Sequence, residues 1–218
     1  MPVKVNLQYI EKWNASLEAA VRAYEAEPIL KDQIVFYGAS NFTRWAAKWD
    51  NTPLREDLLG KSGAPCCINR GFGGSCPEHQ LYYYPRMVRP LAPRVLVYAP
   101  GSSNGKNFGY TREECFELAQ RVVHYALTDF PELRVYLLGN KKNLKIDDAE
   151  WEKRLEYNAW LKAFAEQTPR CFYLEAERYA PMQRDDIFVS DLVHYNQEGY
   201  ALYRDYFKEA LKDELDQY

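Results

Sequence analysis

Ser40, Asp191 and His194 are the residues whose types and spacing point to a chemical reaction. Ser40 follows the apolar run 34–37 and Gly38, at a predicted strand-to-helix turn where backbone N–H groups point at a bound group. A lone serine at such a turn is also typical of a helix cap. A catalytic hydroxyl needs a base within hydrogen-bond reach and a group that orients this base.

His194 is the histidine placed best to serve as that base. It lies just before the predicted last helix, and Asp191 stands three residues ahead of it. An aspartate at this spacing in a turn can reach the imidazole Nδ1 and stabilise the imidazolium, although it can also be an ordinary turn residue. Of the other two histidines, His124 falls inside a helical pattern and His79 in a predicted loop.

The elements that must position these residues alternate along the chain. Short apolar runs that predict buried strands occupy residues 34–37, 66–68, 94–99, 133–138 and 171–174. Helical patterns occupy residues 6–26, 111–129, 148–167 and 197–215. This alternation predicts an α/β sandwich with about five mostly parallel strands. Ligands bind beyond the carboxyl ends of such strands, which directs attention to the loops 38–45, 69–76, 100–109 and 139–145.

Three blocks of the sequence resemble the SGNH hydrolases of the GDSL-like lipase and acylhydrolase superfamily. The first is Phe36 to Ser40 with Arg44-Trp45, which resembles the nucleophile block. The second is Asn69 to Ser75, which is similar to the RGFGGS variant of the family's glycine block. The third is Asp191 to His194 with Asn196, Glu198 and Gly199-Tyr200, which resembles the terminal DxxH block. The blocks follow the family's order and span most of the chain.

The resemblance implies a flavodoxin-like, three-layer α/β/α fold and hydrolysis of acyl esters without a metal or other cofactor. It implies Ser40 as nucleophile, His194 as base and Asp191 as the residue that orients the base. The implied oxyanion donors are the N–H groups of Ser40 and Gly74 and the side-chain amide of Asn104. Ala39 replaces the name-giving Asp of the family, and that side chain is not nucleophile, base or oxyanion donor.

The oxyanion amide is the least regular part of this resemblance. Asn104 comes one residue later than the family's Asn, and Gly105 stands in place of the usual Asp. Ser103 and Asn107 are alternative donors. Gly71, Gly73 and Gly74 can also be explained as permitting a tight loop.

Length, charge and composition narrow the remaining function classes. The 218 residues predict a single domain, 1–218. A net charge of -3 with scattered cations argues against nucleic acid as a partner. No apolar run approaches the roughly 20 residues of a membrane span, and the N-terminal residues lack the apolar core of a secretory signal, so we expect a cytoplasmic protein.

The five cysteines predict reduced, buried thiols, because their number is odd and no CxxC pair occurs. A zinc site of Cys66, Cys67, Cys76 and His79 is disfavoured, because adjacent strand cysteines are expected to point to opposite faces. The loop 101–107 lacks the spacing of a phosphate-binding P-loop. No metal or cofactor is therefore predicted.

The substrate class expected from these observations is a small-molecule ester with a short acyl group, for example an O-acetyl group on a sugar. Aromatic residues near the proposed site could stack on a sugar face or line an acyl pocket, or they could belong to the core; they are Phe42, Trp45, Phe72, Tyr82, Tyr83, Tyr84, Phe108, Tyr110 and Tyr195. The alternative from another class is a carbohydrate-binding module of the same fold without catalysis. The sequence does not indicate an oligomeric state.

Overall fold

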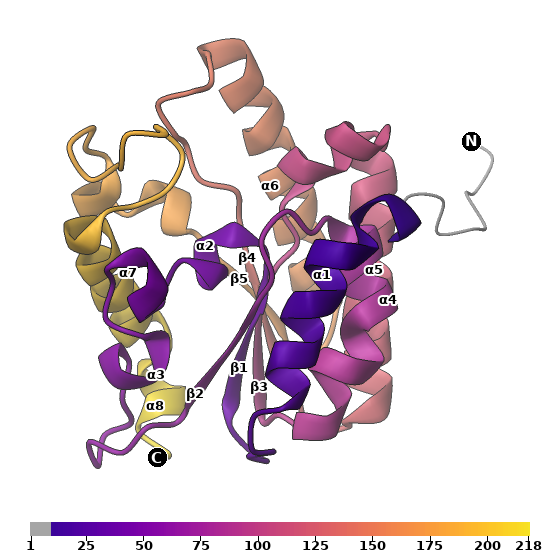
Figure 1. Ribbon diagram of the computed structural model, residues 1–218, viewed down its shortest axis with the longest axis vertical. Coiled ribbons are helices and arrows are strands. Elements are labelled where there is room, and N and C mark those ends of the chain that lie inside the picture. The colour runs from indigo at the N-terminus through magenta and orange to yellow at the C-terminus, as the bar shows by residue number, and fades with distance from the viewer. Residues whose placement is uncertain (1–9) are drawn as a thin grey trace.

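A computed structural model describes residues 10–218 of the chain, and these residues form one parallel sheet between two layers of helices (Figure 1). The sheet has five strands in the order β2-β1-β3-β4-β5, and every neighbouring pair is parallel. The strands are β1 (Ile34–Gly38), β2 (Cys67–Gly71), β3 (Val95–Ala99), β4 (Arg134–Leu138) and β5 (Cys171–Leu174). The predicted three-layer α/β/α fold is confirmed.

The helices divide between the two faces of the sheet (Figure 1). One face is covered by α1 (Ile10–Glu25), α4 (Pro77–Met87), α5 (Arg112–Asp129) and α6 (Asp148–Gln167). The other is covered by α3 (Leu54–Asp57), α7 (Gln197–Ala210) and α8 (Lys212–Leu215), while α2 (Ser40–Thr43) begins where β1 ends. Short 3-10 turns complete the connections: η1 (Ala47–Trp49), η2 (Arg89–Leu91), η3 (Ser102–Phe108), η4 (Ala176–Arg178) and η5 (Ala180–Met182).

Strand β1 shows why the sequence runs are almost continuously apolar. All five of its residues are buried. Val35 and Tyr37 belong to the core under α1, α4 and α5, whereas Ile34 and Phe36 belong to the core under α7. A strand that is covered on both faces must be apolar at successive positions rather than at alternate ones.

An aromatic cluster joins the segment after the nucleophile turn to the last long helix. Trp45 is fully buried and stacks on Tyr203 with ring centroids 5.5 Å apart. Phe207 packs edge-on against Phe36 at 5.0 Å. These contacts join residues that are 158 and 171 positions apart in the sequence, and they hold β1 and the segment after it against α7.

Two expected segments differ from the observed ones near the glycine block. Strand β2 continues to Gly71, so the loop predicted over 69–76 begins only at Phe72. The sequence pattern also does not predict α4, whose first helical residue is Pro77 and which contains Pro85. His79, expected in a loop, lies in the first turn of this helix and is fully buried.

Other differences concern the ends of the chain and the cysteines. The helix expected over 197–215 is broken at Leu211 into α7 and α8, and residues 6–9 of the helix expected over 6–26 lie outside the described part. Cys66 and Cys67 do not point to opposite faces: Cys66 precedes the strand, and their sulfur atoms lie 3.9 Å apart in the same core cluster. All five cysteines are free and buried, as predicted.

Two further observations bear on the sequence predictions. His124 lies exposed on α5 with its ring 5.5 Å from that of Phe164, as a residue of the helix surface should. Within residues 10–218, no helix combines the length and the apolar character that a membrane crossing requires.

Candidate active site

Ser40 is the first residue of α2, in the sharp turn that leaves β1. This turn sits tightly against β2, because a Cβ atom on Gly71 would lie 2.4 Å from the Thr43 nitrogen. Asn69 fastens the same turn: its Nδ2 donates to the Phe42 carbonyl at 2.7 Å, and its Oδ1 accepts from the Gly71 N–H at 2.8 Å. The glycine block therefore holds the serine turn in place from the neighbouring strand.

The Asp191–His194 segment forms a tight turn built by the aspartate itself. One carboxylate oxygen, Oδ1, accepts from the backbone N–H groups of Val193 and His194, each at 2.9 Å. Leu192 takes a left-handed conformation with φ 64°, which is costly for a residue with a Cβ atom. Asn196 then caps α7 by accepting from Gly199 N–H at 3.0 Å. The turn leaves the second oxygen of Asp191 free to face the imidazole.

The fold brings Ser40, His194 and Asp191 into one chain of hydrogen bonds. His194 Nε2 lies 2.8 Å from Ser40 Oγ, and His194 Nδ1 lies 2.8 Å from Asp191 Oδ2. A carboxylate only accepts, so Nδ1 carries the proton and Nε2 accepts from the serine hydroxyl. The three side chains thus have the arrangement of a nucleophile, its base and the group that orients the base.

Arg44, the residue that follows α2, forms an ion pair with Asp191. Its guanidinium lies 2.8 Å from Asp191 Oδ2 and 4.3 Å from the ring centroid of Trp49. Asp191 Oδ2 therefore faces two partners, the imidazole and the guanidinium. Arg44 stands in the nucleophile block of the sequence, but its contact with Asp191 spans 147 positions and no local pattern indicates it.

Burial, helped by nearby cations, favours the neutral form of His194. Burial lowers the pKa of His194 below its usual value, the hydrogen bond to Asp191 opposes this, and the Arg44 guanidinium acts in the same direction as burial. Burial on its own would raise the pKa of Asp191, but backbone N–H groups of His194 and Val193 and the imidazole hold this pKa well below its usual range. A neutral imidazole beside an ionised carboxylate is the state in which His194 can accept a proton.

The candidate oxyanion donors gather around Ser40. Within the described residues, the backbone N–H groups of Ser40 and Gly74 donate to no protein acceptor. Gly74 has φ 83°, a conformation that glycine adopts readily, and a Cβ atom on Gly73 would lie 3.8 Å from that of Ser40. Asn104 donates one Nδ2 proton to the Ser75 carbonyl at 2.9 Å, which ties η3 to the glycine loop, and within the described residues the second amide proton is free.

An open cleft of about 520 Å³ lies against Ser40 and His194. It is lined from the loops after β1, β3 and β4, three of the four loops to which the sequence directs attention. Asn104 and both alternative donors, Ser103 and Asn107, line it. None of the nine aromatic residues expected near the site lines this cleft, and apart from Tyr82 they are buried. The eight buried rings therefore serve packing rather than substrate contact.

A buried group of Cys76, Glu78 and His79 has the residue types of a metal site. Their ligand atoms lie within 4.8 Å of one another. However, the His79 Nδ1 lone pair already accepts from the Cys76 backbone N–H at 3.1 Å, and burial lowers the pKa of His79 to about 4. The backbone bond closes the first turn of α4, so the geometry serves as a helix cap.

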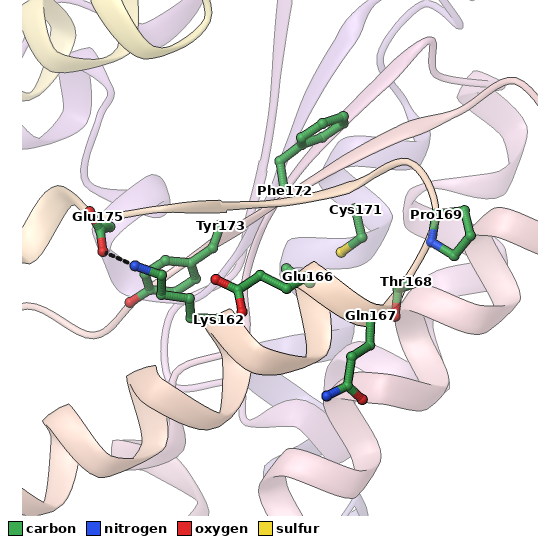
Figure 2. A pocket seen from close by; sticks show the side chains of 10 residues that line it. Lys162, Glu166, Gln167, Thr168, Pro169, Cys171, Phe172, Tyr173 and Glu175 are labelled. Carbon is green, nitrogen blue, oxygen red and sulfur yellow. Dashed lines mark hydrogen bonds and ion pairs between the residues drawn. The ribbon is translucent and has the colours of Figure 1, made fainter.

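A second cleft, of about 540 Å³, is lined by residues between Lys162 and Glu175 and by neither Ser40 nor His194 (Figure 2). It is formed where the end of α6 turns into the edge strand β5. Its one ion pair joins Lys162 and Glu175 at 2.7 Å. Neither a base next to a nucleophile nor a set of convergent donors lines this cleft, so it offers no catalytic arrangement.

Several solved structures share the architecture of this chain, whereas comparisons of sequence found no match. No protein-family model matches the sequence, and a search of curated proteins found no match. Among solved structures, a protein from Streptococcus pneumonia described provisionally as a platelet activating factor superposes with a TM-score of 0.72 at 17% identity, covering 96% of this chain and 97% of that one. A candidate acylhydrolase from Bacteroides fragilis gives 0.68 at 24% identity, with 96% and 97% covered.

A GDSL-like lipase from Bacteroides thetaiotaomicron gives a TM-score of 0.66 at 20% identity, over 96% of this chain and 98% of that one. The chain has the fold of the SGNH hydrolases. This likeness in fold extends over nearly the whole chain, and it agrees with the resemblance carried by the three sequence blocks. The roles of individual residues rest on the geometry described above.

Proposed function

We propose that the protein is a serine esterase that hydrolyses short-chain acyl esters through an acyl-enzyme intermediate. The observation that carries the proposal is the pair of 2.8 Å contacts that link Ser40 Oγ to His194 Nε2 and His194 Nδ1 to Asp191 Oδ2. Ser40 and His194 also line the cleft of about 520 Å³, so a substrate bound there would meet the hydroxyl.

In the proposed reaction, Ser40 Oγ attacks the ester carbonyl carbon while His194 Nε2 takes the hydroxyl proton. The negative charge that develops on the carbonyl oxygen is held by the N–H groups of Ser40 and Gly74 and by the free amide proton of Asn104. His194 then protonates the leaving alcohol, and a water molecule activated by the same imidazole releases the acid from Ser40.

The lining of the cleft supports a small, polar substrate. Among the described residues, its apolar side chains are Ala39, Ala99, Leu138, Ile146 and Val193, which offer little surface to an extended acyl chain. Five asparagines line it, and they offer both donors and acceptors: Asn41, Asn104, Asn107, Asn140 and Asn143. Such a surface suits a hydroxyl-rich alcohol such as an acetylated sugar better than a lipid.

The direct test is turnover of 4-nitrophenyl acetate by the wild-type protein and by Ser40→Ala. We expect the substitution to lower kcat by at least about 10⁴-fold and to abolish labelling by a fluorophosphonate probe. Ser190→Ala is the matched control, because Ser190 is exposed on the loop that carries Asp191 and is not a member of the hydrogen-bond chain of Ser40, His194 and Asp191. Equal turnover in Ser40→Ala and the wild type would contradict the proposal.

A carbohydrate-binding protein without catalysis is the second candidate, and the displaced position of Asn104 in the loop is what favours it. Folded wild-type protein that binds acetylated saccharides, yet neither hydrolyses them nor reacts with the fluorophosphonate, would support this candidate instead. Because the test uses reaction of Ser40 itself, it separates the two without knowledge of the natural substrate.

A further inference from the structure

The cleft beside Ser40 has an uneven distribution of charge. Four cationic residues line it, namely Lys106, Lys141, Lys145 and Arg154, whereas no Asp or Glu among the described residues does. The chain as a whole carries a net charge of -3, so this is a local concentration of positive charge and does not follow from composition. A cleft lined by one sign of charge concentrates ligands of the opposite sign.

Three of these cations can meet a ligand, and the fourth cannot. The Lys141 ammonium is buried, with its Nζ 3.2 Å from the ring centroid of Tyr195, so it faces the core rather than the cleft. Lys145 is exposed and has no ion-pair partner in the described part of the chain. Lys106 is also exposed, and its nearest carboxylate is that of Glu150 at 3.6 Å.

Arg154 supplies a fixed cation in the wall of the cleft. It is about nine-tenths buried, with 9% of its surface exposed, and its Nη1 donates to the Lys141 carbonyl at 3.3 Å. Its Nε makes no hydrogen bond within residues 10–218 and lies 3.7 Å from Glu150 Oε1. Glu150 lies outside the cleft and is shared by Lys106 and Arg154, so one carboxylate faces two cations and leaves positive charge on the lining.

We propose that the ester attacked by Ser40 carries an anionic group, a carboxylate or a phosphate, which Lys106, Lys145 and Arg154 hold in the cleft. The inference rests on the proposed esterase function and narrows its substrate class. The asparagines of the lining contact the uncharged polar part of the same molecule.

The experiment compares kcat/KM for matched neutral and anionic esters. One pair places the charge on the acyl part: 4-nitrophenyl butyrate against the mono-4-nitrophenyl ester of succinate. A second pair places it on the alcohol part: acetoxyacetamide against acetoxyacetate, with acetoxyethyl phosphate as the phosphate arm. We expect the anionic member to be preferred in at least one pair, and this preference to shrink as salt is raised from about 0.02 to 0.5 M, because the exposed lysines are screened.

The variant for the same experiment is Lys106→Gln with Lys145→Gln, which changes two exposed side chains and leaves the buried Arg154 in place. We expect kcat/KM for the preferred anionic ester to fall about tenfold, and that for its neutral partner to change less than about twofold. Lys142→Gln is the matched control. Lys142 lies in the loop after β4, three residues before Lys145, and pairs with Asp148 at 3.2 Å, but it does not line the cleft.

The outcomes separate this inference from the function on which it rests. Turnover of neutral esters that depends on Ser40, without preference for the anionic partner in either pair, would overturn the anionic substrate and leave the esterase standing. An equal loss for neutral and anionic esters in the double variant would also overturn it. Turnover that does not depend on Ser40 would instead remove the esterase proposal itself.

Discussion

The state of one imidazole determines whether Ser40 can act as a nucleophile. His194 must be neutral to take the serine proton, and its pKa lies below the usual value of about 6.5 because burial disfavours the charged ring. As pH rises through this lowered pKa, His194 loses its proton and becomes a base. We therefore expect kcat/KM to rise with pH along a single limb centred below about pH 6.5, and to stay level through neutral pH.

Arg44 is predicted to help set the position of that limb. Its positive charge lowers the pKa of His194, so Arg44→Gln should raise this pKa and move the acid limb of kcat/KM to higher pH. The measurement is the pH profile of both proteins on 4-nitrophenyl acetate. Arg55→Gln is a suitable control, since Arg55 is an exposed residue of α3 and, within the described residues, forms no ion pair with Asp191. An acid limb of kcat/KM at the same pH in Arg44→Gln and the wild type would mean that Arg44 acts only in packing.

The proposed role of Asn104 as an oxyanion donor depends on the second proton of its side-chain amide, the one not bonded to the Ser75 carbonyl. If its free Nδ2 proton stabilises the oxyanion, Asn104→Ala should lower kcat by about 10²- to 10³-fold with little change in KM. Asn107→Ala, which alters another amide of the same cleft, should retain nearly full activity. The reverse result, a large loss in Asn107→Ala only, would assign the donor role to Asn107.

At the scale of elements, the close contact between β2 and the α2 turn controls where Ser40 sits. A Cβ atom on Gly71 would lie 2.4 Å from the Thr43 nitrogen and 2.6 Å from the Phe42 Cβ. Neither atom is the end of a flexible side chain, so the turn itself must shift. We expect Gly71→Ala to lower the free energy of unfolding by about 1–3 kcal/mol and to reduce kcat in the folded fraction.

The comparison for this prediction is Gly63→Ala. Gly63 has φ 80°, but a Cβ atom there would meet nothing within 4 Å. The substitution should therefore cost only about 1–2 kcal/mol of backbone strain and leave kcat unchanged. Urea unfolding and turnover measured on both variants distinguish a displaced active site from a general loss of stability. Full activity in Gly71→Ala would show that the turn is tolerant.

At the scale of the whole molecule, the site exists only when the first strand and the last helix are packed together. Ser40 follows β1, and His194 precedes α7, whose Tyr200 hydroxyl donates to the Asn41 carbonyl at 2.7 Å. The aromatic contacts of α7 with Phe36 and Trp45 hold these distant segments in register. Catalytic competence and global folding should therefore be lost together.

Phe207→Ala tests this coupling. Phe207 is fully buried, so the cavity should lower the free energy of unfolding by about 3–5 kcal/mol. Activity and tryptophan fluorescence should then disappear over the same urea range, shifted to lower urea than in the wild type. Phe172→Ala, on the edge strand and 39% exposed, should shift the transition much less. Loss of activity well before loss of fluorescence would show that the site unfolds independently.

The sequence by itself determined the five strands, most of the long helices between them and the local turn that joins Asp191 to His194. Apolar runs that alternate with helical patterns lead to a parallel sheet, and a parallel sheet gathers its loops at the carboxyl ends of the strands. A turn of four residues is specified by its own side chains, as the two backbone N–H groups on Asp191 Oδ1 show. These features depend on neighbours in the chain, which sequence patterns describe well.

Only the tertiary structure decided which distant groups meet. The contact of Arg44 with Asp191, the bond from Asn104 to Ser75 and the cations around the cleft join segments that no periodicity relates. Helix α4 was not predicted, because Pro85 and the aromatic residues of this segment disfavour a helix locally. Packing of the segment on α5 and α1 stabilises the helix in the folded protein. Long-range packing outweighs local preference at these positions, and the charge of the cleft, which selects the substrate in our proposal, is a property of the assembled loops alone.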